Sequence, residues 1–207
     1  MYSKTFVKLS LFCIVCISVW SCSEAGKTIE TIEFSKDYKF SSQIQEQLAK
    51  DTLAWKYQIS ASDYATKGDY KNALLQWDLA MRGREQNYTK QQIDSLQTLY
   101  STVNAKHFII SEAAKNQVVI INEAHHNSLH RMFTKSLLKD LYEQGYRYVG
   151  LEALGNGKYL DPELNTRKYP VQETGNYIKD PQFGALVRTA LALGFTVLPY
   201  EETTNVN

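Results

Sequence analysis

Three short apolar runs divide the second half of the chain, and stretches with helical periodicity separate them. The runs cover residues 118–121, 146–151 and 195–199. A short apolar run bounded by turn residues is typical of a buried strand. Strands that alternate with helices form right-handed βαβ units. Residues 116–207 are therefore predicted to form an α/β domain with a parallel βαβαβ core.

Two amphipathic patterns predict the helices between these strands. The first covers residues 128–144 and ends at Gly145, and the second opens at Pro181 and ends at Gly194. Proline is favoured in the first turn of a helix and glycine just after the last turn. The apolar faces are predicted to carry Leu129, Phe133, Leu137, Leu138 and Leu141 in the first helix, and Phe183, Leu186, Val187, Ala190 and Leu191 in the second.

An acidic residue follows each of the three predicted strands. Glu123 follows the first strand, Glu152 the second, and Glu201 with Glu202 the third. In a parallel sheet the carboxyl ends of the strands meet at one edge, where ligands bind. Because a carboxylate is costly to bury unless it is paired or coordinated, acids at these positions favour a functional site. Glu123 and Glu152 are its strongest candidates.

Three of the four histidines fall within a span of six residues after the first predicted strand. They are His125, His126 and His130, whereas His107 is isolated on a predicted helix and is interpreted as a surface or packing residue. Imidazole changes charge near neutral pH and ligates metals readily. A loop histidine beside Glu123 can act as a general base or a ligand, while His130 lies in the first turn of the helix that Asn127 or Ser128 caps.

Residues 118–130 resemble the first motif of the superfamily that joins ChaN-like haem-binding proteins, Tiki-type metalloproteases and erythromycin-esterase-like hydrolases. Typical members have a strand, Gly-Glu, one or two residues, a histidine and a helix, and then a second strand that ends in Glu. Gly150, Leu151 and Glu152 match the end of that second strand. Residues 188–195, followed by Tyr200 and Glu201, resemble the third helix and strand of esterase-like members, so Arg188 and Glu201 become further candidates.

The resemblance implies two alternative activities. In the esterase-like branch the general base lies three residues after the first glutamate, at His126. A base at His125 or His126, with Glu123 and Glu152 orienting it or holding a metal, would then hydrolyse a small-molecule substrate. This hydrolase is the leading expectation.

In the haem-binding branch the corresponding residues are His125 and His130, with Asn127 also matching. Haem or a divalent metal would then be held by Glu123, His125, His130 and Glu152.

Two features depart from the family: Asn122 replaces the usual glycine before the first glutamate, and the sequence ends at Asn207, where family members continue. The α/β domain is therefore expected to be truncated.

The N-terminus predicts a bacterial lipoprotein. Lys4 and Lys8 precede an apolar core at 9–20, which is shorter than the roughly 20 residues that cross a bilayer and typical of a signal peptide. Residues 19–22 resemble a relaxed lipoprotein box that ends in Cys22, although Trp20 replaces its usual small residue. We expect a signal peptide at 1–21, acylation of Cys22 in the cell envelope, and a polar tether at 22–40.

Charge and cysteine content agree with that picture. The chain has 23 basic and 22 acidic residues, so no nucleic-acid partner is expected. Cys13 and Cys16 lie inside the predicted signal core, where hydrophobic filling is a simpler interpretation than a redox or zinc pair.

Residues 41–115 are predicted to be helical. Residues 61–80 resemble one tetratricopeptide unit with a turn at 68–70, and such repeats need about three copies for a continuous core, so a helical hairpin is favoured over a peptide-binding groove. A third helix is expected over 90–115. A protein that binds partners through this segment, without catalysis, is a further alternative. Inside the unit, Ala73, Leu74 and Trp77 are predicted to pack inward. The helical spacing before it is that of Leu48, Thr52, Trp55 and Ile59, and the third helix is expected from Ile93, Leu96, Leu99, Val103, Phe108 and Ile109.

Overall fold

The computed structural model describes residues 38–81, 87–152 and 154–201. The signal peptide, Cys22 and Glu202 lie outside the described residues. In the part of the chain that is described, no helix is both long and apolar enough to cross a membrane.

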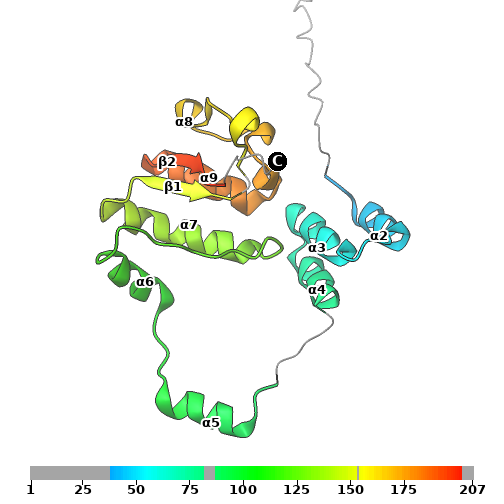
Figure 1. The fold of residues 1–207 in the computed structure, drawn as a ribbon, viewed down its shortest axis with the longest axis horizontal. Helices are drawn as coiled ribbons and strands as arrows, with labels where there is room; N and C mark the ends of the chain where they lie inside the picture. The colour runs from blue at the N-terminus through cyan, green and yellow to red at the C-terminus, as the bar shows by residue number, and fades with distance from the viewer. Residues whose placement is uncertain (1–37, 82–86, 153, 202–207) are drawn as a thin grey trace, which may run out of the picture. The chain divides into compact units, whose positions relative to one another are not determined.

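The second half of the chain is an α/β structure built on two parallel strands. β1 (Tyr148–Leu151) pairs with β2 (Thr196–Pro199), and Val149 lies opposite Val197. α7 (Ser128–Glu143) precedes β1 and packs against α9 (Pro181–Leu193), which leads into β2 (Figure 1). The α/β class, the two helices and the second and third predicted strands are therefore confirmed. Between β1 and α9 the chain forms short elements: η2 (Gly157–Tyr159), α8 (Leu164–Arg167), η3 (Gln172–Thr174) and η4 (Asn176–Lys179).

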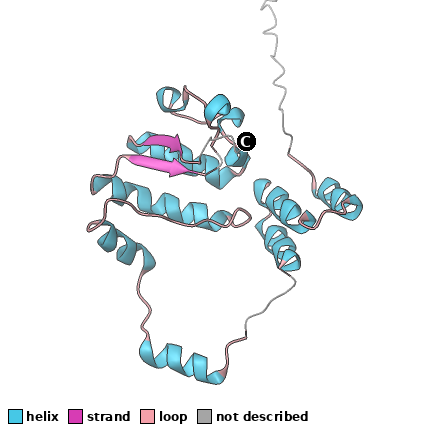
Figure 2. Cartoon of the chain, viewed as in Figure 1, coloured by secondary structure: helices cyan, strands magenta, loops and turns pink. Residues whose placement is uncertain are grey.

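Residues 118–121 do not form the expected first strand. Within the described residues, β1 and β2 make the one sheet, and residues 118–121 pair with neither (Figure 2). Val119 and Ile121 pack against the core, whereas Val118 is 71% exposed and Ile120 is 84% exposed. A full βαβαβ core is therefore not shown, because a strand needs a hydrogen-bonded neighbour and the exposed side chains leave one face of this segment uncovered.

The apolar face of α7 is confirmed in its second half only. Leu137, Leu138 and Leu141 are buried, whereas Leu129 and Phe133 are 58% and 36% exposed. The inward positions at the start of α7 are taken by Ser128 and Arg131, each 1% exposed. α7 therefore points polar side chains inward near its N-terminus, and the predicted site lies at this end of the helix. The surrounding core contains Leu151, Leu154, Leu164, Phe183, Leu186, Val187, Ala190, Leu191, Phe195 and Val197.

The first half of the described chain is helical, as predicted, but its helices are shorter. Residues 90–115 form two helices and not one, because the chain is extended at Tyr100 and the side chain of Asn104 begins a new helix by accepting from His107 N. The pattern from Ser41 is likewise interrupted, since the Asp51 side chain accepts from Leu53 N. The helices are α2 (Ser41–Lys50), α3 (Lys56–Thr66), α4 (Tyr70–Ala80), α5 (Lys90–Leu99) and α6 (Ala105–Ala113).

α3 and α4 form the predicted helical hairpin. Gly68 has φ +82°, and Asp69 caps α4 by accepting from Asn72 N. A positive φ favours glycine, which explains the turn at this point. Ala73 is fully buried as expected, whereas Leu74 is 42% exposed, so its predicted inward packing was wrong.

Candidate functional site

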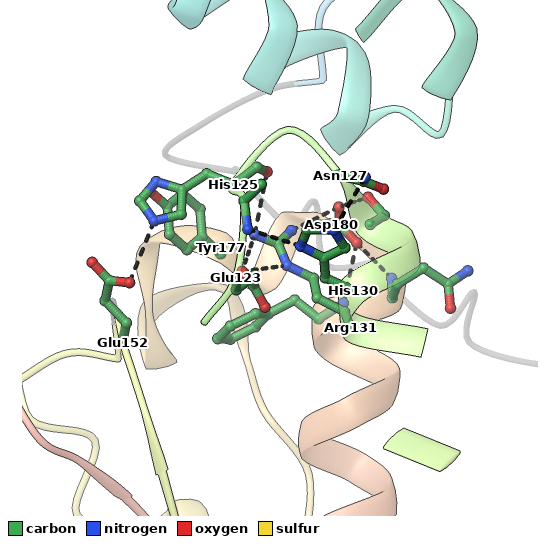
Figure 3. Close-up of polar contacts among 12 residues, drawn as sticks. Glu123, His125, Asn127, His130, Arg131, Glu152, Tyr177 and Asp180 are labelled. Atoms are coloured by element: carbon green, nitrogen blue, oxygen red, sulfur yellow. Dashed lines mark hydrogen bonds and ion pairs between the residues drawn. The ribbon is translucent and has the colours of Figure 1, made fainter. Parts of the chain in front are cut away.

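Arg131 organises the loop that carries the histidines. Its guanidinium donates from Nε to Glu123 Oε1 over 2.8 Å and forms an ion pair with Asp180 Oδ2 at 2.8 Å (Figure 3). The same group donates to the carbonyl oxygen of His125 over 3.3 Å. Because Arg131 is 1% exposed, these bonds compensate for the burial of its charge. Glu123 and the backbone at His125 are thereby fixed to α7.

Asp180 ties the starts of α7 and α9 together. It accepts a hydrogen bond from the Ser128 hydroxyl and caps α9 by accepting from the backbone N–H groups of Gln182 and Phe183. The rings of Tyr177 and Phe183 lie 5.1 and 5.2 Å from the Arg131 guanidinium carbon. The base of the site is therefore a buried ion network enclosed by aromatic rings.

His125 lies between a carboxylate and a phenol. Its Nε2 is 3.3 Å from Glu152 Oε2, and its Nδ1 is 2.6 Å from the Tyr177 hydroxyl. An ionised carboxylate can only accept, so Nε2 carries the proton in neutral His125, and Tyr177 donates to the Nδ1 lone pair. The side chains of His125 and Glu152 are 40% and 45% exposed, so this pair is open to solvent.

The acids predicted at the strand ends act on the same tyrosine. Burial raises the pKa of Tyr177, and the charge of Glu152 raises it further, whereas Arg131 lowers it and Glu123 and Glu201 again raise it. Tyr177 therefore keeps its proton at neutral pH. These three carboxylates also raise the pKa of Tyr200, after burial as the largest cause. The charges of Glu123, Glu152 and Glu201 thus act on the same two tyrosines even though residues 118–121 form no strand.

His126 is buried, and the helical hairpin covers it. It is 7% exposed and stacks on Trp77, with ring centroids 3.9 Å apart and an angle of 11° between the rings. Its Nδ1 is buried and has no hydrogen-bond partner among the described residues. Burial lowers its pKa, and the nearby His130, His125 and Arg131 add to that effect while Asp78 opposes it. The residue predicted as the base of the esterase-like branch is therefore enclosed, and His125 takes the place beside Glu152.

The lowered pKa of His126 predicts a loss of stability on acidification. The unfolded chain takes up a proton at its ordinary pKa of 6.5, whereas folded His126 resists protonation until lower pH. The free energy of unfolding therefore falls as the pH drops below about 6.5, and His126 contributes no such penalty above that value. Urea denaturation at about pH 7.5 and 5.5 measures the difference.

His126→Phe, which keeps a ring against Trp77, should reduce this pH dependence. His107→Gln is the matched control because His107 is exposed on α6, and it should leave the dependence unchanged. An identical fall in stability between the two pH values in the wild type and His126→Phe would contradict the assignment.

His130 and Asn127 stabilise the loop. His130 Nδ1 accepts from Ala124 N over 3.0 Å, and Asn127 caps α7 by accepting from Leu129 N over 3.2 Å. The Asn127 amide nitrogen is also 3.3 Å from His130 Nε2. Both residues thus hold the turn that presents His125.

The residues expected to hold a metal or haem are not arranged as a ligand set. In the described ranges, no three His, Cys, Asp or Glu side chains are placed to bind one metal ion. Arg131 pairs with Glu123, and both ring nitrogens of His125 are hydrogen-bonded. His130 already uses Nδ1 as a backbone acceptor. These donors do not fit a metal ion or haem iron.

Two predicted candidates remain, Arg188 and Glu201, and three residues of the site were not predicted. Arg188 is exposed in the middle of α9, whereas Glu201 is exposed beyond the end of β2. Arg131, Tyr177 and Asp180 were not predicted. Arg131 lies seven residues, or two helical turns, before Leu138, so both side chains lie on the same buried face of α7. An arginine at a buried helix position indicates a buried ion pair. Tyr177 has no such pattern, because it lies in a 3-10 helix far along the chain.

Comparison of the chain with protein-family models, with curated proteins and with solved structures found no match.

Proposed function

We propose that this protein is a hydrolase of small-molecule esters in which His125 is the central acid–base group. The hydrogen-bonded chain from Tyr177 through His125 to Glu152 carries this proposal. It has the order that general-base catalysis requires: a carboxylate fixes the tautomer of an imidazole, and the basic nitrogen faces the group that exchanges a proton. The exposure of His125 and Glu152 leaves that chain open to a substrate.

Each neighbouring residue has a defined part in the proposed reaction. Glu152 accepts from Nε2–H and stabilises the imidazolium that forms when Nδ1 gains a proton. Arg131 holds the backbone carbonyl of His125 and therefore the position of the ring. Water is the nucleophile. When water loses its proton to the hydrogen-bonded series of Tyr177, His125 and Glu152, it becomes the hydroxide that attacks the ester carbonyl. The same proton is then delivered to the leaving alkoxide.

The resemblance to erythromycin-esterase-like hydrolases supports the same reaction class. The proposal differs from the expected esterase motif in one residue, since the base is His125 and not the enclosed His126. We also propose that residues 118–121 add a further strand to the sheet and complete a βαβαβ arrangement. Val119 and Ile121 pack against the hydrophobic core, which is the alternation expected of a strand.

The test is hydrolysis of p-nitrophenyl acetate and of ethyl acetate by the full chain, followed by absorbance and by pH titration. Saturable turnover above the uncatalysed rate is expected for both esters. Absence of turnover, together with a haem absorption band at one haem per chain that His130→Ala abolishes, would overturn the proposal in favour of ligand binding.

We also propose that the protein is lipid-anchored through Cys22 in the bacterial cell envelope. The charged start, the short apolar core and Cys22 support this proposal. Cys22→Ala should abolish incorporation of a labelled fatty acid and release the protein from membranes, because one residue carries the anchor. Cys16→Ala, inside the apolar core, is the matched control and should keep the label. Membrane retention of Cys22→Ala with no acyl label on the wild type would contradict the anchor.

A further inference from the structure

Tyr177 occupies the basic nitrogen of His125. The hydroxyl is 2.6 Å from Nδ1, and the rings are 4.8 Å apart at an angle of 49°. Glu152 already accepts from Nε2–H, so neutral His125 has no free lone pair for water. A proton can reach His125 Nδ1 directly only through the phenol oxygen.

The surroundings of Tyr177 suit an oxygen that gains and loses a proton. The Arg131 guanidinium carbon lies 5.1 Å from the centre of the ring, where its charge stabilises developing negative charge on the phenol. Phe183 packs edge-on against the same ring at 6.1 Å between centroids, which restricts its rotation. In the resting protein the half-buried phenol keeps its proton and donates a hydrogen bond to His125 Nδ1.

We propose that Tyr177 is a catalytic residue that transfers protons between His125 and the reacting water and leaving group. The inference rests on the proposed hydrolase function. As water attacks, its proton passes to the Tyr177 oxygen while the Tyr177 proton passes to His125 Nδ1. The C–O bond to the leaving group then breaks, the leaving oxygen takes the proton from Tyr177, and His125 returns its proton to Tyr177. One water is consumed, one acid and one alcohol form, and Tyr177, His125 and Glu152 regain their starting states.

Tyr177→Phe in the full chain is the first test, because it removes the hydroxyl and keeps the ring against Arg131 and Phe183. We expect kcat for ethyl acetate to fall by about 10²-fold or more, with KM changed by less than about threefold, since the lost interaction belongs to the transition state. Tyr148→Phe, on β1 and 69% exposed, is the matched control and should keep the wild-type kcat. Tyr177→Phe with at least half of the wild-type kcat would overturn the inference while leaving the hydrolase proposal in place.

The second test does not depend on turnover. Nitrogen-15 NMR of the histidine side chains in the wild type, with His125 assigned through His125→Gln, should show the proton on Nε2 and a hydrogen-bonded Nδ1. The Nδ1 resonance should move toward that of a free imine nitrogen in Tyr177→Phe. A proton on Nδ1 in the neutral wild-type ring would overturn the inference even if the protein hydrolyses esters. An inactive wild type with the expected spectrum would overturn the hydrolase function, and with it the catalytic role of Tyr177.

Discussion

His125→Gln is expected to lower kcat for ester hydrolysis by about 10²–10⁴-fold, the usual contribution of a general acid–base group. This corresponds to about 3–5 kcal/mol of transition-state stabilisation. Glutamine keeps a polar side chain of similar reach toward Glu152 but cannot take up a proton. Because the imidazole exchanges a proton only during the reaction, KM should change little. Initial rates with p-nitrophenyl acetate and ethyl acetate measure both constants.

The two adjacent histidines allow a sharp comparison. His126→Phe should retain most of the wild-type kcat near neutral pH, because His126 is enclosed against Trp77 and His125 takes the position beside Glu152. His107→Gln, on the exposed side of α6, controls for the loss of a histidine. An active His125→Gln beside an inactive His126→Phe would instead assign the base to His126, as the sequence motif first suggested.

The sequence predicted those parts of the fold that depend on local pattern. Periodicity and the flanking Pro181 and Gly194 predicted α9, and Gly145 marked the end of α7, because caps and glycines act within a few residues. Residues 118–121 have the composition of a strand but lack a paired neighbour, which no local pattern reveals. The break between α5 and α6 was missed since a near-helical spacing of apolar residues outweighed the capping residue Asn104.

The site was predicted in part for the same reason. Glu152 directly follows an apolar run, and Glu123 and His125 follow another within four residues, so chain direction alone predicts them near one edge. The partners of His125 depend on segments distant in sequence: Tyr177 is 52 residues away along the chain. The choice between His125 and His126 also needed the structure, because the spacing of the motif fits both and the burial of His126 comes from Trp77 in α4.

Arg131→Ala should destabilise the protein by about 3–5 kcal/mol, because removing one partner of a buried ion pair leaves the others uncompensated. Asp180 is 2% exposed at its side chain, and Glu123 is 21% exposed. Without the guanidinium, Asp180 would keep the Ser128 hydroxyl and the cap of α9, but its charge would be buried without a cation. Since a domain is stable by only about 5–15 kcal/mol, a loss of this size removes a large part of the total.

Arg188→Ala is the matched control for that substitution. Arg188 is exposed on α9, so its removal should change the free energy of unfolding by no more than about 0.5 kcal/mol. Arg131→Lys keeps a positive charge but cannot bridge Glu123 and Asp180 with separate nitrogens, and it should fall between the two. Urea denaturation of all three variants gives the comparison. A change below about 1 kcal/mol for Arg131→Ala would show that the carboxylates find other partners or water, and that the guanidinium does not fix the loop that presents His125.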